Sequence, residues 1–513
     1  MKKSPFSLRS FLEDNFPMLP LALLSCMLFG IASYGVLLFQ KLSVHDDIHY
    51  FFSVGATYSS GRWFLGLLGE LVSRVFGSGH FSTSEWNGLL TLLFLGLTQG
   101  VLVSLLELKR KRSVVLACGI LTVFPSICSL FGYAFTAPYY TFGYLLAALG
   151  VWLTTKKRWG YLGGIVLIAC STGIYQANFA FSLCLLLLVF LHRVAGAEHW
   201  TGADLARTLL CNALVCALAL GLYLAANTLA VKLSGTVLDS YMGISDMTSR
   251  GISVYLRRVR QALFLFFRPG AASRRAHAFP FQTLPLYYVT LVLDFLYALL
   301  LLYRARKSSP ARLLTLILGM AAFPLAVNFI YVLSDFQDSH VLMVYCQAMV
   351  FVALCDLAEH VPVSVPLRRL AAAVLVFTAL CYVRYDNIYA TQFEIYQQRS
   401  ISYLNQLATQ IKQFPGYTAQ TKVAFVSKNA QMDATFPDIP ELEVVSALPF
   451  SYHVSAISDG FRDYLNIWCG FVPEYADPAD YQDLPQVMAM PSYPDSGSMA
   501  IIGDTLVVKF WGG

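Results

Sequence analysis

Residues 17–39 of the chain read PMLPLALLSCMLFGIASYGVLLF, a run without a single charged side chain. About 20 predominantly apolar residues are enough for a helix to cross the hydrocarbon core of a bilayer. The run is too long for the apolar core of a signal peptide and no A-x-A site follows it, so we expect an uncleaved first membrane span. Lys2, Lys3 and Arg9 precede it, which predicts a cytoplasmic N-terminus.

The rest of the chain has the same apolar character. Of its 513 residues, 57% are hydrophobic and 13% are charged, about half the charged fraction of an average soluble chain. So few charges cannot form the polar surface that a soluble protein needs, which excludes the soluble, disordered, collagenous and coiled-coil classes. A polytopic α-helical membrane protein remains. No nucleotide-binding fingerprint is present, and no nucleic acid partner is expected.

The net charge of +6 hides two parts of opposite sign. Residues 1–385 hold 30 Lys and Arg against 16 Asp and Glu, whereas residues 386–513 hold 6 against 14. We therefore predict a membrane domain over 1–385 and an acidic extracytoplasmic domain over 386–513, long enough to bury a small core. Helical spacing over 388–413 and β-rich runs near the C-terminus predict an α/β fold for the second domain, with strands at 422–426 and 443–447 and a hairpin at 499–502 and 505–510.

Short basic clusters between the apolar runs predict about eleven spans, with the N-terminus in the cytoplasm and residues 386–513 outside. A polar middle at 171–178 divides the run 160–191 into two of these spans. The other spans are expected at about 17–39, 86–108, 114–131, 138–155, 206–230, 284–303, 311–333, 341–357 and 369–385.

Two segments between spans are expected to lie on the outer surface as amphipathic helices. If the basic cluster at 109–112 lies in the cytoplasm, residues 40–85 lie outside, and the apolar piece 63–76 within them cannot span. Its apolar residues recur at helical spacing. The loop 232–283 has a net charge of +6, and part of it forms an apolar stripe beside several arginines. Such a helix suits the level of the lipid headgroups.

The first outer loop carries the strongest chemical signal. Asp46 and Asp47 are adjacent carboxylates just past a membrane helix, where burial and mutual repulsion favour a raised pKa and a role as general base. Arg62, in Gly61-Arg62-Trp63, offers a planar fork that suits phosphate. The alternative is an ordinary hydrated loop whose acids cap a helix.

Three further polar groups are expected near the same outer face. The loop arginines would clamp a lipid-linked phosphate or, alternatively, attract anionic lipid in general. The other two groups, in the broken run 160–191 and after the span 311–333, would bind substrate or, alternatively, form hydrated turns. The residues are Arg250, Arg257 and Arg258 in the basic loop, Tyr175 and Gln176 in the broken run, and Asp335, Asp338 and His340 after 311–333.

Asp46-Asp47 followed by Gly61-Arg62-Trp63, on a multi-span chain of this length, resembles the GT-C glycosyltransferases. More narrowly it is similar to the glucosyltransferase type II (GtrII-like) family of bacteria. The stretches Gly173-Ile174-Tyr175-Gln176-Ala177 and Tyr385-Asp386-Asn387 also look like that family. The resemblance covers essentially the whole chain, most clearly 1–180 and 320–410.

The resemblance implies an enzyme of the bacterial plasma membrane with a GT-C-like fold and juxtamembrane helices on the outer side. Its donor would be a polyprenyl-phosphate-linked sugar, glucose by analogy, and its acceptor a cell-surface glycan. One of Asp46 and Asp47 would deprotonate the acceptor hydroxyl, which would attack the anomeric carbon with inversion. Charge alone, and no motif, assigns the phosphate to Arg62 and the loop arginines.

No cofactor is assigned from the sequence. No Cys or His spacing predicts a metal site, and the only carboxylates that suggest a divalent metal are Asp46, Asp47, Asp335 and Asp338, so metal dependence stays open. The alternatives in function are a transporter or flippase for lipid-linked saccharides, and a polymerase or ligase of surface glycans. A transporter would place its polar groups near the bilayer midplane, whereas here they gather at one predicted face.

Overall fold

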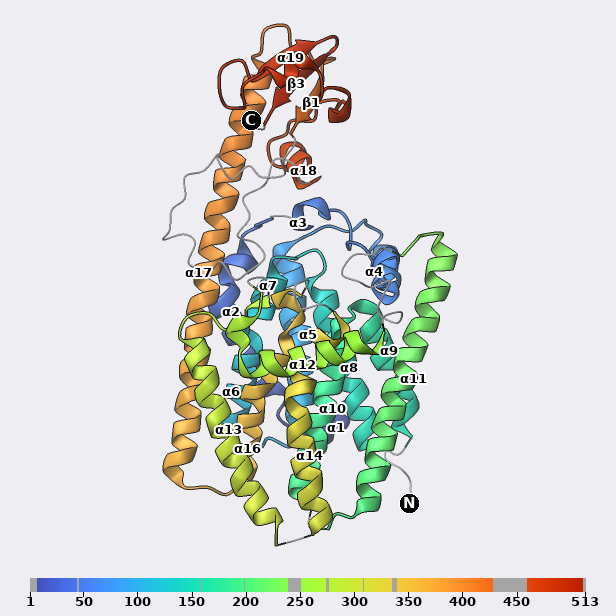
Figure 1. Ribbon diagram of the computed structural model, residues 1–513, viewed down its shortest axis with the longest axis vertical. Coiled ribbons are helices and arrows are strands. Elements are labelled where there is room, and N and C mark those ends of the chain that lie inside the picture. The colour runs from blue at the N-terminus through green and yellow to red at the C-terminus, as the bar shows by residue number, and fades with distance from the viewer. Residues whose placement is uncertain are drawn as a thin grey trace. The chain divides into compact units, whose positions relative to one another are not determined.

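The fold is known from a computed structural model that describes residues 7–43, 46–157, 159–197, 199–238, 251–273, 276–307, 309–334, 339–427 and 459–510. It is mostly helical, with one small sheet close to the C-terminus (Figure 1). The chain forms two compact units. The first contains the described residues of Met1–Lys41 and Phe52–Ile388, and the second those of Leu42–Phe51, Tyr389–Ser446 and Phe450–Gly513.

The first unit is a bundle of helices. Its N-terminal half contains α1 Leu8–Asn15, α2 Leu19–Phe39, η1 Tyr58–Ser60, α4 Trp63–Phe76, α5 Ser84–Leu105, α6 Lys111–Val123, α7 Pro125–Phe131, α8 Ala137–Lys156, α9 Gly160–Ile174 and α10 Ala177–Gly196. It continues with α11 Gly202–Ser234, α12 Ile252–Phe267, η3 Pro269–Ala271, α13 Thr283–Ala305, α14 Pro310–Val327, α15 Ile330–Leu333, η5 Val341–Met343, η6 Tyr345–Ala348 and α16 Met349–His360. The helix α17, Val365–Lys412, begins here and continues into the second unit.

The helices follow from the apolar runs and from local start and stop signals. Thr201 and Asp204 form a capping box that begins α11. Pro125 begins α7, and the axes of α6 and α7 meet at a bend of 49°. Proline has no backbone N–H to donate to the preceding turn, so it interrupts the helix there. The expected break in 160–191 is also present, at Tyr175 and Gln176 between α9 and α10.

Seven helices in the described parts of the chain are long and apolar enough to cross a membrane, or eight if the bent pair α6–α7 is one span. They are α2, α5, α10, α11, α13, α14 and α17. The protein is therefore membrane-embedded, but the predicted total of about eleven spans is not confirmed. The spans expected at 138–155, at the start of 160–191 and at 341–357 correspond to α8, α9 and α16, which fall outside this set.

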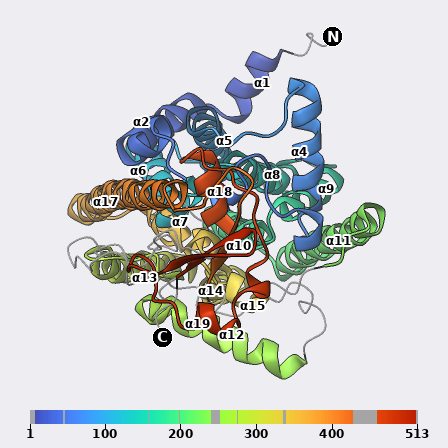
Figure 2. The same ribbon diagram turned by 90° about the horizontal axis from the view of Figure 1, so that it is seen from above.

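Both expected amphipathic segments are helices. Figure 2, seen from above, shows α4 and α12 extending sideways while the long helices are viewed nearly end-on. In α4 the residues Leu65, Gly66 and Gly69 are buried, whereas apolar side chains such as Leu71 are exposed. The arginines of α12, however, do not all lie opposite its apolar stripe, because Arg258 is buried at 5% exposure.

The second unit builds a three-stranded sheet against helices. It contains α3 Asp46–His49, β1 Lys422–Val426, α18 Asp459–Ile467, η8 Pro478–Asp480, α19 Pro485–Met488, β2 Met499–Ile502 and β3 Thr505–Lys509, together with the C-terminal part of α17. The strand order is β1-β3-β2, with β3 parallel to β1 and antiparallel to β2. Gly503, at φ +67°, permits the tight turn between β2 and β3. The strand expected at 443–447 lies outside the described residues.

The hydrophobic core of the second unit includes residues from the distant N-terminal loop. Ile48 and Phe51 pack with Leu407 of α17, Phe461 of α18 and Leu506 of β3. The loop of the two candidate catalytic acids is therefore part of this unit, although the sequence boundary at 385 and 386 placed it in the membrane domain. The span expected at 369–385 and the helix expected at 388–413 form one continuous helix, α17.

Candidate functional site

The side chain of Arg62 is positioned by a short loop at the start of α4. The 3₁₀ turn η1 ends at Gly61, whose φ of +72° is readily adopted only by glycine. The backbone N–H of Arg62 then donates to the carbonyl of Thr57 at 2.8 Å, which closes the loop. Arg62 is consequently the N-cap residue of α4.

The guanidinium of Arg62 lies over two tyrosine rings. Its central carbon is 5.4 Å from the ring centroid of Tyr175 and 5.8 Å from that of Tyr140. The two rings are stacked on each other, with centroids 4.5 Å apart and an interplanar angle of 14°. Within about 6 Å of an aromatic face a cation is attracted by the ring quadrupole, so the tyrosine pair holds the positive charge of Arg62 in place.

Gln176 and Tyr223 fix the loop that carries Arg62. The amide nitrogen of Gln176, the residue before α10, donates to the carbonyl of Ser60 at 2.7 Å and lies 3.3 Å from the hydroxyl of Tyr223 in α11. That hydroxyl donates to the carbonyl of Gly61 at 3.1 Å. Both side chains are buried, so two consecutive loop carbonyls are satisfied inside the bundle.

Gly173 leaves the space in which α4 approaches α9. A β-carbon at this position would lie 2.6 Å from Nε1 of Trp63 and 3.1 Å from Cβ of Phe64. The stretches 61–63 and 173–177, which are far apart in the sequence, therefore meet in one cluster. Tyr175 and Gln176 were expected to contact substrate. In the structure the ring of Tyr175 lies against the guanidinium of Arg62, and the amide of Gln176 binds the loop before it.

The carboxylates of Asp46 and Asp47 belong to the second unit and have different surroundings. Asp47 has no exposed surface, and its Oδ2 accepts a hydrogen bond of 2.6 Å from the hydroxyl of Ser43. The backbone of Ser43 is itself held by Gln397 of α17 and by the hydroxyl of Tyr464. Burial, and then the charge of Asp47, raise the pKa of Tyr464, so this hydroxyl stays a donor. Asp46 is only partly buried.

The other residues predicted for the site differ in their burial and contacts. Arg258 donates to the carbonyls of Val332 and Leu333 at 3.3 and 3.1 Å, so its guanidinium joins α12 to α15. Arg257 is exposed and His340 is partly buried. Arg250, Asp335 and Asp338 lie outside the described residues.

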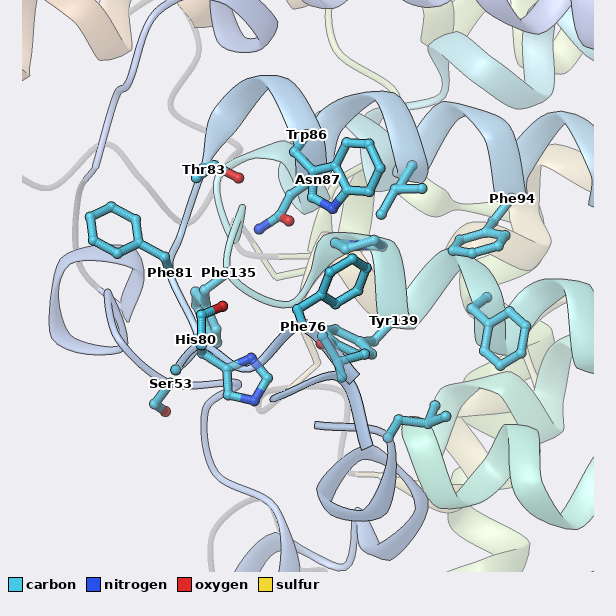
Figure 3. A pocket seen from close by; sticks show the side chains of 17 residues that line it. Ser53, Phe76, His80, Phe81, Thr83, Trp86, Asn87, Phe94, Phe135 and Tyr139 are labelled. Atoms are coloured by element: carbon cyan, nitrogen blue, oxygen red, sulfur yellow. The ribbon is translucent and has the colours of Figure 1, made fainter. Parts of the chain in front are cut away.

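A cavity of about 710 Å³ lies beside α4 in the first unit. Figure 3 shows aromatic side chains around it, among them Phe76, Trp86 and Tyr139, with the polar groups of His80 and Asn87 at its wall. Burial lowers the pKa of His80, whose Nε2 lies 3.1 Å from the hydroxyl of Ser73. Sequence analysis did not predict this cavity, because its walls come from separate segments that share no motif.

Two buried polar groups of the first unit were not predicted as site residues. Asp386 has no exposed surface and faces Ser33, Tyr34 and Cys128; the sequence drew attention to it only as part of the stretch Tyr385-Asp386-Asn387. His192, Asp356 and His360 form a cluster that could hold a metal ion. The one sequence signal for that cluster was an acid, Asp356, inside an apolar run.

A family model described as glucosyl transferase GtrII matches residues 35–354. The matched region contains the Arg62 cluster, the cavity and both candidate acids. No curated protein matches the chain, and no solved structure does.

Proposed function

The chain belongs to the glucosyl transferase GtrII family, and we propose that it moves a glucosyl unit from a polyprenyl-phosphate donor to a hydroxyl group of a cell-surface glycan. The family makes the protein a membrane glycosyltransferase. The donor lipid, the acceptor and the mechanism are our proposal. Its supporting observation is the Arg62 cluster. The guanidinium lies over two stacked tyrosines, and Gln176 and Tyr223 donate hydrogen bonds to the carbonyls of Ser60 and Gly61 in the loop that carries Arg62.

Arg62 has the chemistry needed for the leaving group of this reaction. When the bond between the anomeric carbon and the phosphate oxygen breaks, negative charge develops on the polyprenyl phosphate. A guanidinium that is already oriented stabilises that charge without reorganising, which is the main electrostatic means of lowering a barrier. The hydroxyl groups of Tyr140 and Tyr175 belong to the same cluster and would supply further hydrogen bonds to a phosphate or sugar.

We assign the general base to Asp46. Its carboxylate would take the proton of the acceptor hydroxyl as the oxygen attacks the anomeric carbon, while the phosphate leaves from the opposite face with inversion. Asp47 is the weaker candidate because it is fully buried and bound to Ser43, and it would orient the loop. Accessibility is the observation that supports this choice between the two acids.

The aromatic cavity beside α4 suits the lipid part of the donor. Its wall is largely apolar and contains Phe81, Trp86 and Phe94 (Figure 3), which favours an isoprenoid chain over water. The cavity and Arg62 lie on the same unit and share the helix α4, whose residues Leu68 and Val72 line the cavity. We propose that the lipid chain lies in the cavity along α4, while the phosphate at its end lies at Arg62, where α4 begins.

The remaining expected residues have secondary roles in this proposal. Arg257 and Arg250 would attract the phosphate of the incoming donor, whereas Arg258 positions α15. Asp335, Asp338 and His340 would contact the acceptor glycan. The N-terminus would face the cytoplasm of a bacterial cell and the second unit would lie outside the plasma membrane. No metal is assigned to the reaction.

The decisive experiment compares the surface glycans of cells with and without the protein by mass spectrometry. We expect an added hexose in its presence, identified as glucose by hydrolysis and chromatography. Purified protein given synthetic polyprenyl-phosphate glucose and the isolated glycan should form the same product. A purified protein that only moves the lipid-linked sugar across a vesicle membrane, without forming product, would support the transporter instead; nothing in the family match favours it.

A further inference from the structure

The side chains of His192, Asp356 and His360 meet at the end of α10 that is farthest from Arg62. The Nδ1 atoms of His192 and His360 lie 2.8 and 3.0 Å from the same oxygen, Oδ1 of Asp356. The two imidazole rings are 4.8 Å apart in an edge-to-face arrangement. One ligand atom from each of the three residues falls within 4.8 Å of the others.

The cluster is built by two helices rather than by one loop. Asp356 and His360 are four residues apart on α16, which places them on one face of that helix. His192 comes from the last turns of α10, 164 residues away from Asp356 in the sequence. The side chains of His192 and Asp356 are only 11% and 9% exposed, and that of His360 is 36% exposed. A small ion could therefore enter beside His360.

The surroundings of the cluster are suited to a cation. Glu359, next to His360, accepts hydrogen bonds from the backbone N–H groups of Lys109 and Arg110 through Oε1. Its buried Oε2 has no hydrogen-bond partner among the described residues. A cavity of about 230 Å³ is lined by His192 and Asp356 and also by Asp294, which leaves room for a further ligand such as water.

We propose that His192, Asp356 and His360 bind a divalent transition metal ion of the zinc type, which fastens the end of α10 to the end of α16. Two imidazoles and one carboxylate are borderline donors that suit Zn²⁺ and its neighbours better than Mg²⁺ or Ca²⁺. With Zn–ligand bonds of about 2.0–2.1 Å, tetrahedral donors are roughly 3.3 Å apart. The two N–O separations are typical of hydrogen bonds, so the ion would replace the shared protons and widen these two separations by a few tenths of an ångström.

This ion would be distant from the glycosyl transfer. His192 follows Gln176 by sixteen residues along α10, which corresponds to about 24 Å at the rise of an α-helix. The metal would thus act on the bundle and not on the reacting atoms. Binding that favours the folded state over the unfolded one raises thermal stability in a concentration-dependent manner.

The test uses the full-length protein in detergent after removal of metals with a chelator. We expect it to bind one Zn²⁺ per chain, as measured by elemental analysis after gel filtration, and to rise in unfolding temperature with added Zn²⁺. Co²⁺ should give visible absorption bands of a four- or five-coordinate site, and millimolar Mg²⁺ should not displace it. His360→Ala should weaken Zn²⁺ binding at least ~10-fold and remove the Co²⁺ bands.

His199→Ala is the matched control, because His199 is an exposed histidine outside the cluster. It should leave both the Zn²⁺ affinity and the Co²⁺ bands unchanged. The proposal is overturned if the wild-type protein binds no Zn²⁺, or if His360→Ala binds it as tightly as the wild type. A stabilisation that depends on pH but not on metal would identify the cluster as a hydrogen-bonded His-Asp-His group and would also overturn it.

Discussion

The side-chain amide of Gln176 donates a hydrogen bond of 2.7 Å to the backbone carbonyl of Ser60, 116 residues earlier in the chain. Gln176 stands at the break between α9 and α10, and Ser60 stands two residues before Arg62. This buried contact therefore helps to position the cation on which the proposed chemistry depends.

Gln176→Leu should weaken both the site and the fold. The substitution leaves the carbonyl of Ser60 buried without its partner, a penalty of about 1–3 kcal/mol. We expect a lower unfolding temperature in detergent and a larger loss in kcat than that stability loss alone explains. Thr228→Val is the control, since the Thr228 hydroxyl donates to the carbonyl of Leu224 within its own helix and has no other hydrogen bond to the described residues. Equal losses in the two variants would contradict the role of Gln176.

Arg62→Ala should slow glycosyl transfer while the protein remains folded. Removing one group that stabilises charge in the transition state typically costs about 10²–10³ in kcat. Arg62→Lys should recover only part of the rate, because an ammonium lacks the planar fork that binds phosphate at two points. Steady-state kinetics with the polyprenyl-phosphate sugar measure both variants, and a fully active Arg62→Ala protein would remove Arg62 from the mechanism.

Gly173→Ala should separate α4 from α9. The new β-carbon would lie 2.6 Å from Nε1 of Trp63, so overpacking of about 1–3 kcal/mol is expected. Gly221→Ala in α11 is the control, because no other part of the described structure lies within 4 Å of its new β-carbon. That change should leave stability equal or raise it by about 0.5–1 kcal/mol, as for other helical glycines. Unfolding temperatures of the two variants give the comparison.

Asp46→Asn and Asp47→Asn should fail in different ways. Loss of a general base typically reduces the rate about 10²–10⁴-fold, so Asp46→Asn should abolish transfer at an unchanged unfolding temperature. Asp47→Asn keeps a side-chain oxygen that can accept from Ser43 and should retain more activity. Ser43→Ala tests that contact separately. If Asp47→Asn alone abolishes transfer in a stable protein, the two roles are reversed.

Protonation of His80 should make the first unit less stable in mild acid. Burial lowers the pKa of His80 below its usual value, so the unfolded chain binds a proton more readily than the folded one. The contribution of neutral His80 to the free energy of unfolding is then complete above the ordinary histidine pKa of about 6.5. It is lost as the pH falls from there toward the lower pKa that His80 has in the folded protein. His80→Gln should flatten this part of the profile of unfolding temperature against pH; an unchanged profile would contradict it.

Local sequence patterns were sufficient for most elements. Helical spacing predicted 63–76, which is the range of α4, and β-rich runs predicted β1 at 422–426 and the hairpin of β2 and β3. The polar interruption at 171–178 located the break between α9 and α10. These features depend on residues close together in the chain, where period and turn chemistry act directly. The predicted number of spans was not confirmed, because short apolar helices inside a bundle and spans have similar compositions.

The sequence by itself determined a membrane-embedded helical protein with an acidic C-terminal part, and it drew attention to Asp46, Arg62, Tyr175 and Gln176. Tertiary structure alone decided that residues 42–51 pack in the core of the second unit and that Arg258 turns inward to carbonyls of α15. It also brought His192 to Asp356 across 164 residues. The physical reason is that apolar patterning selects which face of a segment is buried, whereas the partner of a buried polar group is chosen by packing between segments that are remote in the sequence.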